Sequence, residues 1–264
     1  MGRIAFLSDI HGNFEALEAV IAHAETKGVD RFVSFGDLIG YGPSPVECLD
    51  TIQRLDIDSV LGNHEKLMLD HRALYNREKK KPYGWVTDDV AQTVMRSHLL
   101  LVDQEDFLDN LPYTLWKGEE KVVVTHSSLV LPTNFNYIKT VKEAEQNFRL
   151  FEEDEVLGMG HTHVPKVWSL KDGLTYYTVP EGSCTIDLVG EKHIINAGSI
   201  GQPRDDDWRA CYAIYDSDAK TVEFYRVEYA IQETVRKIEN TKLPNAVKRS
   251  LVEKLKGGRR ENDS

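Results

Sequence analysis

The sequence is poor in cysteine and in long apolar runs, and each shortage argues against a class of protein. The three cysteines, Cys48, Cys184 and Cys211, stand far apart and form no Cys-x-x-Cys pair. This spacing favours neither a disulfide framework nor a zinc site built from thiolates. No stretch approaches the roughly 20 apolar residues of a membrane-spanning helix, and the first apolar strand begins too early for a signal peptide. We therefore expect a protein of the reducing cytoplasm with no membrane partner.

Positive charge is scarce as well. The 264 residues include 32 Lys and Arg against 43 Asp and Glu, which gives a formal net charge of −11. Non-specific binding to long nucleic acid needs clustered basic residues that release counter-ions from the phosphates, so this composition argues against such a partner. A polyanionic substrate would need local compensation, most simply by metal ions. Internal repeats and low-complexity segments are also missing, and we expect residues 1–264 to form one domain.

What the sequence does contain is a series of short apolar runs, each of which ends in a polar motif. Such runs are typical of buried strands, and the helical spacing of apolar residues predicts helices over 14–24 and 46–55, with Asn13 as the cap of the first. Strands that alternate with helices predict a largely parallel sheet whose carboxyl ends gather at one crevice. The motifs are DIH after residues 4–7, GD after 31–35, GNHE after 59–61, His126 after 122–124 and GHTH after 156–159.

Two further regions differ from this pattern. Residues 66–111 are charged and helical in composition, with a helix-like stretch over 88–101, and we interpret them as an insertion beside the crevice. After residue 166, six shorter strand patterns predict a second sheet that is mixed or antiparallel. Residues 231–264 predict a tail of two amphipathic helices, and the basic side chains of the final helix are expected to face solvent.

The polar residues at the strand ends have the chemistry of a site for two metal ions. Imidazole and carboxylate ligands without thiolate suit Mn, Fe, Co, Ni or Zn better than Ca or Mg. Residues two apart in extended chain share a face, so Asp9 and His11 are expected to point at one ion. Two ions about 3.5–4 Å apart need a shared anionic ligand, for which Asp37 is the natural bridge, and a bridging water would become a nucleophile near neutral pH. The full set is Asp9, His11, Asp37, Asn63, His64, His126, His161 and His163.

The motifs, in this order, resemble those of the calcineurin-like metallophosphoesterase superfamily. The resemblance covers roughly residues 3–165, and the segment 196–204, Asn-Ala-Gly-Ser-Ile-Gly-Gln-Pro-Arg, further resembles the small bacterial and archaeal phosphodiesterase-like branch and extends the match to about residue 216. The fold that we expect is of the α/β (α+β) class, a four-layer αββα sandwich with two central mixed β-sheets. The insertion at 66–111 would then stand near the mouth of the site.

The resemblance also implies roles for individual residues. His64 matches the catalytic histidine, which stands near the leaving-group oxygen as a general acid or charge stabiliser. Glu65 stands where many relatives have Asp, and the role implied for that carboxylate is to orient the catalytic histidine. Asn63 and Arg204 are candidate contacts for substrate. The metal ligands implied are Asp9, His11, Asp37 and His163 for one ion, and Asp37, Asn63, His126 and His161 for the other.

Several residues keep a plainer interpretation. Arg204 is either a bidentate contact for a substrate phosphate or a surface arginine in a Pro-rich turn. We interpret the aromatic residues Tyr41, Tyr83 and Trp85 as packing residues, with stacking on a base as the alternative. The remaining histidines are interpreted as ordinary structural or exposed ones: His23, His71, His98 and His193.

The function that we predict is hydrolysis of a phosphoester bond by two divalent or trivalent transition-metal ions, with Mn or Fe favoured. A metal-bearing scaffold for protein assembly is the alternative; members of the superfamily with that role lack the catalytic histidine, whereas His64 is present here. The substrate stays open among phosphodiesters, nucleotide polyphosphates, phosphomonoesters and phosphoproteins, because the shared core reads only the phosphate. The resemblance favours a small, nucleotide-like phosphorylated molecule. The sequence says nothing about the oligomeric state.

Overall fold

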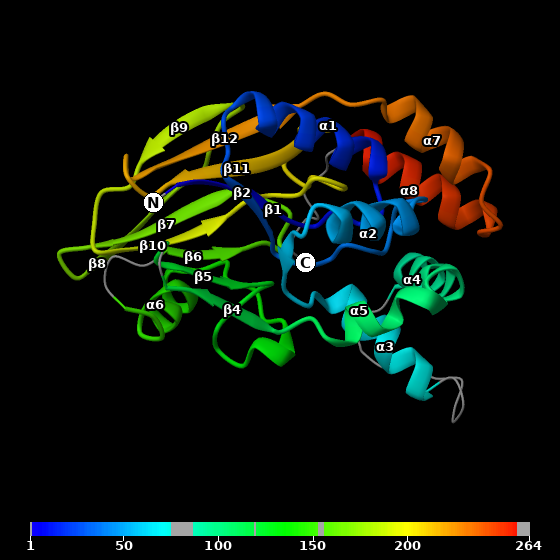
Figure 1. The fold of residues 1–264 in the computed structure, drawn as a ribbon, viewed down its shortest axis with the longest axis horizontal. Helices are drawn as coiled ribbons and strands as arrows, with labels where there is room; N and C mark the ends of the chain where they lie inside the picture. Colours follow the sequence, from blue (N-terminus) through cyan, green and yellow to red (C-terminus); the bar gives the residue numbers. More distant parts are fainter. Residues whose placement is uncertain (1, 75–86, 119, 153–155, 258–264) are drawn as a thin grey trace.

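Two six-stranded sheets stack face to face at the centre of the molecule, and helices cover the outer face of each (Figure 1). The structure is a computed structural model and describes residues 2–74, 87–118, 120–152 and 156–257. The resulting order of layers is helix, sheet, sheet, helix. This arrangement confirms the predicted αββα sandwich with two mixed sheets.

The first sheet joins the beginning of the chain to its last strands. Its order is β3-β2-β1-β11-β12-β9, with β1, β2 and β3 parallel and β11 antiparallel to β1. In this register Ile4 lies opposite Arg31 on one side and Tyr215 on the other. The strands are β1 (Arg3–Leu7), β2 (Arg31–Ser34), β3 (Asp58–Ser59), β9 (Cys184–Asp187), β11 (Ala210–Asp216) and β12 (Thr221–Val227).

The second sheet has the order β4-β5-β6-β10-β7-β8, in which β5, β6 and β10 are parallel and the other neighbours antiparallel. Our expectation of one parallel sheet that carries all the motifs, followed by a second built from later strands, is therefore wrong. The motifs are divided between the sheets, and the later strands return to both. The strands are β4 (Thr114–Lys117), β5 (Val122–Thr125), β6 (Val156–Met159), β7 (Lys166–Lys171), β8 (Leu174–Thr178) and β10 (Lys192–Asn196).

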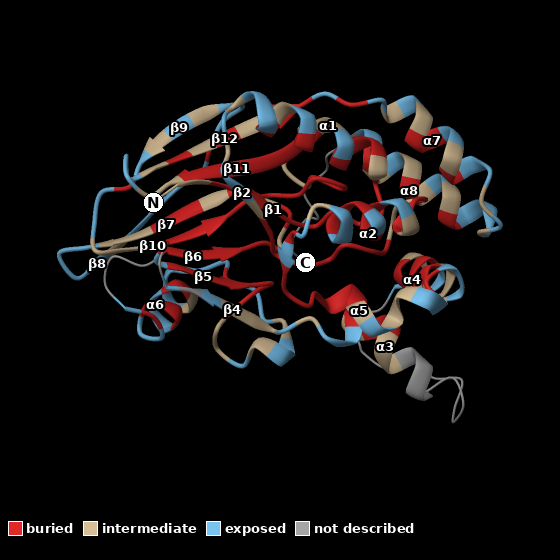
Figure 2. Cartoon of the chain, viewed as in Figure 1, coloured by how far each residue is buried: buried red, intermediate tan, exposed pale blue. Residues whose placement is uncertain are grey.

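Alternation along the strands separates three layers of core. On β1, Ile4 and Phe6 face the other sheet, whereas Ala5 and Leu7 face the helices, because successive side chains of a strand point to opposite faces. On β5, Val123 likewise turns away from the inter-sheet layer toward α6 (Val141–Phe148). Figure 2 shows the buried residues concentrated in the central strands and on the inward faces of the helices.

Most helices lie on the outer face of the first sheet or at the end where the motifs gather. On the sheet, α1 (Phe14–Thr26) begins at Asn13, whose side chain accepts a hydrogen bond from the Ala16 N–H (3.3 Å), as predicted for a cap. None of the helices in the described ranges has the length and apolar composition of a membrane span. The others are α2 (Pro45–Arg54), α3 (Asn63–Leu74), α4 (Asp88–Leu100), α5 (Glu105–Asp109), α7 (Ile231–Glu239) and α8 (Asn245–Gly257), with 3₁₀ helices over Val102–Gln104 and Pro132–Asn134.

The predicted insertion and tail meet at one end of the molecule. Helix α4 packs against α3 from its own region, against α2 and against α8 of the tail. At this contact Asp89 of α4 accepts a hydrogen bond from Ser250 and pairs with Lys254 (3.3 Å), both on α8. Tyr83 and Trp85, candidates for stacking on a base, lie outside the described residues.

Candidate metal centre

Five of the predicted ligand residues follow the strands in sharp, left-handed turns. Their φ angles are 50° for Asp9, 49° for His11, 51° for Asp37, 65° for His161 and 59° for His163. An L-residue in this conformation is unfavourable by roughly 1–2 kcal/mol, and such strain persists mainly where function requires the geometry. The expectation that Asp9 and His11 share a face of extended chain is therefore wrong. Each side chain reaches the centre because its backbone turns at that residue.

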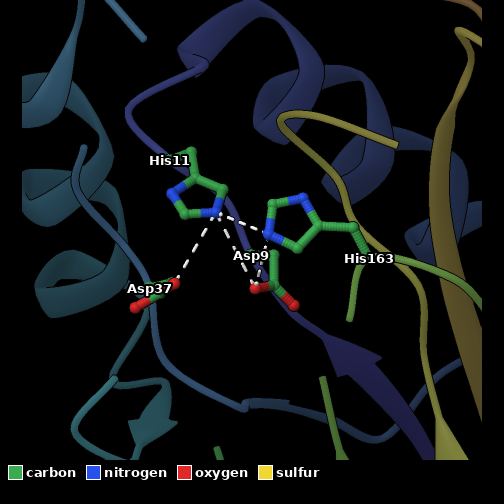
Figure 3. Close-up of side chains that lie close together, drawn as sticks. All are labelled: Asp9, His11, Asp37 and His163. Atoms are coloured by element: carbon green, nitrogen blue, oxygen red, sulfur yellow. Dashed lines mark hydrogen bonds and ion pairs between the residues drawn. The ribbon is translucent and has the colours of Figure 1, made fainter. Parts of the chain in front are cut away.

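Four side chains form a first cluster, Asp9, His11, Asp37 and His163, whose ligand atoms all lie within 4.8 Å of one another (Figure 3). The Nε2 atoms of His11 and His163 are 3.0 Å apart. Asp9 Oδ1 lies 3.2 Å from His163 Nε2, and Asp37 Oδ2 lies 3.6 Å from His11 Nε2. Three loops of the two sheets thus aim their polar atoms at one point.

Hydrogen bonds behind the rings determine which nitrogen faces that point. His11 Nδ1 lies 3.1 Å from the carbonyl oxygen of Ile39, and His163 Nδ1 lies 2.6 Å from that of Gln202. A carbonyl only accepts, so each Nδ1 carries a proton, and in the neutral ring Nε2 presents a lone pair. Two lone pairs that face each other at 3.0 Å repel unless a cation lies between them. This arrangement fits a metal ion, whose histidine ligands are usually oriented in this way.

A second cluster of Asp37, His126 and His161 adjoins the first. Nε2 of His126 lies 2.9 Å from Asn63 Oδ1, 3.1 Å from His161 Nδ1 and 3.4 Å from Asp37 Oδ2. Behind the ring, His126 Nδ1 donates to the carbonyl of Phe35 (2.7 Å). The amide oxygen of Asn63 completes a set of four donors, and Asp37 belongs to both clusters.

Each carboxylate has one oxygen held by the protein and one directed into the centre. Asp9 Oδ2 accepts hydrogen bonds from the Ser8 hydroxyl (2.6 Å) and the His161 N–H (2.9 Å). Its Oδ1 is buried and accepts no hydrogen bond within the described part of the chain. Asp37 Oδ1 accepts the N–H of His64 at the start of α3 (2.9 Å), while Oδ2 faces the histidines. A buried carboxylate oxygen without a donor is expensive unless a cation satisfies it.

The pKa values describe the same centre without its cations. Burial alone would raise the pKa of Asp37, but His126 and His64 lower it well below its ordinary value. Burial lowers the pKa of His126, but the carboxylates of Asp37 and Asp9 outweigh it and raise that pKa to about 9. Burial and the charge on His126 lower the pKa of His161 to about 3. In the metal-free chain a proton on His126 therefore balances the carboxylates, and a metal ion must displace it.

Two glycines of the motifs allow the loops to approach the carboxylates. A Cβ on Gly62 would lie 2.2 Å from Asp37 Oδ1, and one on Gly160 would lie 1.8 Å from Ser8 Oγ and 2.3 Å from Asp9 Oδ2. Both distances are far shorter than van der Waals contact. The GNHE and GHTH motifs therefore require glycine for close packing against the ligands.

The predicted catalytic residue, His64, begins α3 beside the clusters. Its side chain is buried, with Nε2 3.9 Å from Asp37 Oδ2 and its ring centre 4.6 Å from that of His11. Burial lowers the pKa of His64 to about 4, although Asp37 acts in the opposite direction. The ring is therefore neutral at pH 7 in the metal-free chain.

Glu65 joins the loop that carries Asp37 to the start of α3. Its carboxylate accepts hydrogen bonds from the N–H groups of Asp37 (3.0 Å), Ile39 (3.0 Å) and Gly62 (2.9 Å). Burial and the charge on Asp37 raise the pKa of Glu65 to about 7, while these hydrogen bonds oppose the rise. Glu65 thus holds the backbone that presents Asp37. The orienting role toward His64 that the resemblance implies stays a prediction.

A cavity of about 240 Å³ opens onto both clusters and His64. Arg204, at its edge, donates from Nη2 to the hydroxyl of Tyr41 (3.3 Å). On the other side the ring of Tyr137 stacks on His161, with centres 4.3 Å apart and planes inclined by 15°. Sequence reasoning missed Tyr137 completely, since an aromatic residue in a loop has no periodic pattern that would single it out.

The final helix also reaches this cavity. Lys254 of α8 lines it, lies 5.9 Å above the ring of Tyr41 and pairs with Asp89. The Lys254 side chain is 38% exposed, so it is in contact with solvent, as expected for the basic side chains of this helix, and also lines the cavity. Only the packing of α8 on α4 brings the lysine to the site.

Three of the four other histidines have ordinary partners, as predicted. His23 lies 2.8 Å from the hydroxyl of Tyr212, and His98 lies 2.9 Å from a carboxylate oxygen of Glu105. His193 lies 2.9 Å from the hydroxyl of Ser169. The side chain of His71 lies outside the described part of the structure.

Comparison with known proteins agrees with this geometry. Residues 2–194 match the family of calcineurin-like phosphoesterases, a span that contains all the ligand residues named above. The chain belongs to the calcineurin-like phosphoesterase family. Phosphoesterases of this kind use a metal centre, and the two buried His/Asp clusters are consistent with a dinuclear one. The predicted membership of this superfamily is thus confirmed.

Several known proteins are similar to this chain. A crystal structure of a metallophosphoesterase from Sphaerobacter thermophilus is 33% identical, with a TM-score of 0.79 over 97% of this chain and 99% of that one. An uncharacterised protein of Methanocaldococcus jannaschii is 33% identical over 91% of this chain and 93% of its own. A symmetrical bis(5′-nucleosyl)-tetraphosphatase of Baumannia cicadellinicola is 26% identical over 62% of this chain and 56% of its own.

Proposed function

We propose that this chain hydrolyses a phosphoester bond with two transition-metal ions as cofactors, Mn or Fe being favoured. The observation that carries the proposal is the place of Asp37, a buried carboxylate whose Oδ2 faces the histidines of both clusters. Asp9, His11 and His163 would complete the first site. Asn63, His126 and His161 would complete the second.

The cations would supply Lewis acidity toward the phosphate oxygens and lower the pKa of a water that attacks phosphorus. The chain itself would orient the substrate. Arg204 and Asn63 stand at the edge of the cavity, where a guanidinium and an amide N–H can each donate to a phosphate oxygen.

His64 would transfer a proton to the leaving-group oxygen. Its pKa near 4 applies to the metal-free chain, and the negative charge of a bound phosphate raises the pKa of a neighbouring imidazole. The buried position beside the cavity would place the ring within reach of the leaving group. Proton transfer by His64 distinguishes the proposed enzyme from the alternative function, a scaffold that binds metals without turnover.

The proposed substrate is a small phosphorylated molecule, with nucleotides favoured. The tetraphosphatase relative acts, by its name, on a nucleotide polyphosphate, and the net charge of −11 disfavours long nucleic acid. A cavity of about 240 Å³ at the metal centre accommodates a phosphate and part of its ester group.

Metal content and turnover test this function together. The purified protein is stripped with a chelator and reloaded with Mn, and its metal content is measured beside hydrolysis of bis(p-nitrophenyl) phosphate and p-nitrophenyl phosphate. We expect two ions per chain and turnover that depends on them. Two ions without turnover of any phosphoester would favour the scaffold, and fewer than two would contradict the dinuclear centre.

A further inference from the structure

A second cavity of about 310 Å³ adjoins the one at the metal centre. The two cavities share Tyr137 and Arg204 as lining residues. The second is also lined by Thr162, which stands between the ligands His161 and His163 in the chain. It therefore begins within one residue of the proposed ligands.

The polar lining of this second cavity is cationic. Lys139, Lys166 and Arg204 line it, and no described Asp or Glu does so. This local excess of positive charge stands in a chain whose net charge is −11. Positive side chains that converge in a hollow of an acidic protein favour an anionic ligand, because the low-dielectric walls focus their field.

Lys166 on β7 shows the excess of positive charge in this cavity most clearly. Its amine lies 4.9 Å above the ring of Trp168 and 5.0 Å above that of Tyr177. Within the described ranges it forms no ion pair, and burial lowers the pKa of its ammonium group. A partly buried ammonium over aromatic rings lacks the compensation that a carboxylate would supply. A bound anion would supply it.

The rest of the lining is apolar. Ile138, Val164 and Val179 provide aliphatic walls, and Trp168, which is only 2% exposed, underlies Lys166. The hollow can therefore accept an organic group next to the anion. An inorganic ion alone would leave these walls without a contact.

We propose that this second cavity binds a phosphoryl group on the leaving-group side of the substrate, so that the preferred substrates carry at least two linked phosphoryl groups, as in a nucleoside polyphosphate. The proposal rests on the proposed function, because it places the scissile phosphate at the metal centre. Lys166, Lys139 and Arg204 are then residues that determine specificity. A substrate with a single phosphate would place no anion beside Lys166.

The bond changes follow from that placement. The oxygen of a water joins the scissile phosphorus, and the bond from this phosphorus to the bridging oxygen breaks. The bridging oxygen keeps the electron pair and leaves on the second phosphoryl group, where it takes the proton that His64 transfers. The proton released from the water passes to solvent, from which His64 is protonated again. The charge that develops on the leaving phosphate lies where Lys166 and Arg204 can stabilise it.

The decisive experiment measures binding without turnover. Isothermal titration of the chelator-treated protein with inorganic pyrophosphate, ADP and adenosine is performed on the wild type and on Lys166→Met, which keeps the length of the stem. The matched control is Lys171→Met, an exposed lysine on the same strand. We expect Lys166→Met to weaken binding of pyrophosphate and ADP at least tenfold, Lys171→Met to remain within twofold of wild type, and Lys166→Arg to restore affinity.

Three outcomes would overturn the proposal. These are failure of the wild type to bind pyrophosphate or ADP, equal weakening by both Met variants, and binding of adenosine as tight as that of ADP. Turnover gives an independent measure. In the Mn-loaded enzyme, Lys166→Met should lower the ratio of kcat/KM for diadenosine tetraphosphate to that for bis(p-nitrophenyl) phosphate by tenfold or more. Binding without hydrolysis of any substrate would refute the proposed function and leave the anion site standing.

Discussion

At the scale of single residues, the two carboxylate oxygens of Asp37 make different contacts. Oδ1 accepts the N–H of His64 at the start of α3, and Oδ2 faces the histidines of both clusters. The same group therefore positions the proposed catalytic histidine and bridges the proposed metal sites. Substitutions of Asp37 and of His64 test the bridging of the metal sites and the proton transfer separately.

Asp37→Asn should remove activity and the second metal ion. The amide keeps the size of the side chain but loses the negative charge that two cations would share. Elemental analysis should find at most one ion per chain, against two in the wild type. The control is Asp187→Asn, an exposed carboxylate on β9 that should keep both ions and full turnover. Two ions bound to Asp37→Asn would show that the bridge is assigned wrongly.

His64→Ala should keep both metals and lower turnover by a factor of about 10² or more on a substrate with a poor leaving group, in the range expected for loss of acid catalysis. The loss should be smaller for bis(p-nitrophenyl) phosphate, because nitrophenolate leaves without a proton. Steady-state kinetics with both substrates, together with metal analysis, check this. Unchanged turnover of the substrate with the poor leaving group would rule out the role given to His64.

At the scale of elements, the centre depends on loops that the two sheets hold together by backbone hydrogen bonds. The N–H of Ile200 donates to the carbonyl of Ser8 (3.0 Å), and that of Gly160 donates to the carbonyl of His126 (3.0 Å). The ligand side chains are therefore carried by loops whose ends are fixed in paired strands. This rigidity maintains five left-handed ligand residues against their conformational cost.

His193 on β10 makes the stability of the second sheet depend on pH. Burial lowers its pKa to about 4, below the value near 6.5 expected in the unfolded chain. Between these values the unfolded state binds more protons, so stability is complete above about pH 6.5 and decreases as the pH falls toward 4. By pH 4.5 the loss in free energy of unfolding should be about 2.5 kcal/mol.

The measurement compares wild type with His193→Gln, which lacks the titrating group but can still reach the Ser169 hydroxyl. Urea unfolding of the metal-free proteins at pH 7 and pH 4.5 gives the two differences in free energy. On acidification the free energy of unfolding of the variant should rise by about 2.5 kcal/mol relative to that of wild type. A difference that is the same at both pH values would contradict the assignment to His193.

At the scale of the whole molecule, metal ions should contribute to stability as well as to chemistry. The clusters join loops from both sheets, so ions that bind only the folded chain stabilise the whole sandwich. At a free metal concentration 1,000 times Kd, one site contributes about 4 kcal/mol. Chelation should therefore lower Tm by several degrees, as followed by circular dichroism. The shift should be smaller in Asp37→Asn, and an equal shift in both proteins would place the stabilising ion elsewhere.

Much of the strand pattern and the residues of the two candidate metal clusters were predictable, because both are local signals. Runs such as Val122–Val124 are apolar at every position, and the polar motifs that follow them are adjacent in the sequence. The assignment of strands to sheets was not predictable. β11 pairs with β1 across about 200 residues of chain, and nothing in the sequence of either strand specifies that register.

The sequence by itself therefore determined which side chains are available for the proposed chemistry, since a carboxylate, imidazole or amide is present or absent whatever the fold. Only the tertiary structure decided how they act together: the left-handed turns at Asp9 and His11, the clamp of Glu65 on three backbone N–H groups, and the arrival of Lys254 from the final helix. The cationic cavity around Lys166 was likewise decided only by the tertiary structure. Each of these features arises from contacts between segments far apart in the chain. The interaction energy of such contacts depends on distance in space, so they leave no local pattern in the sequence.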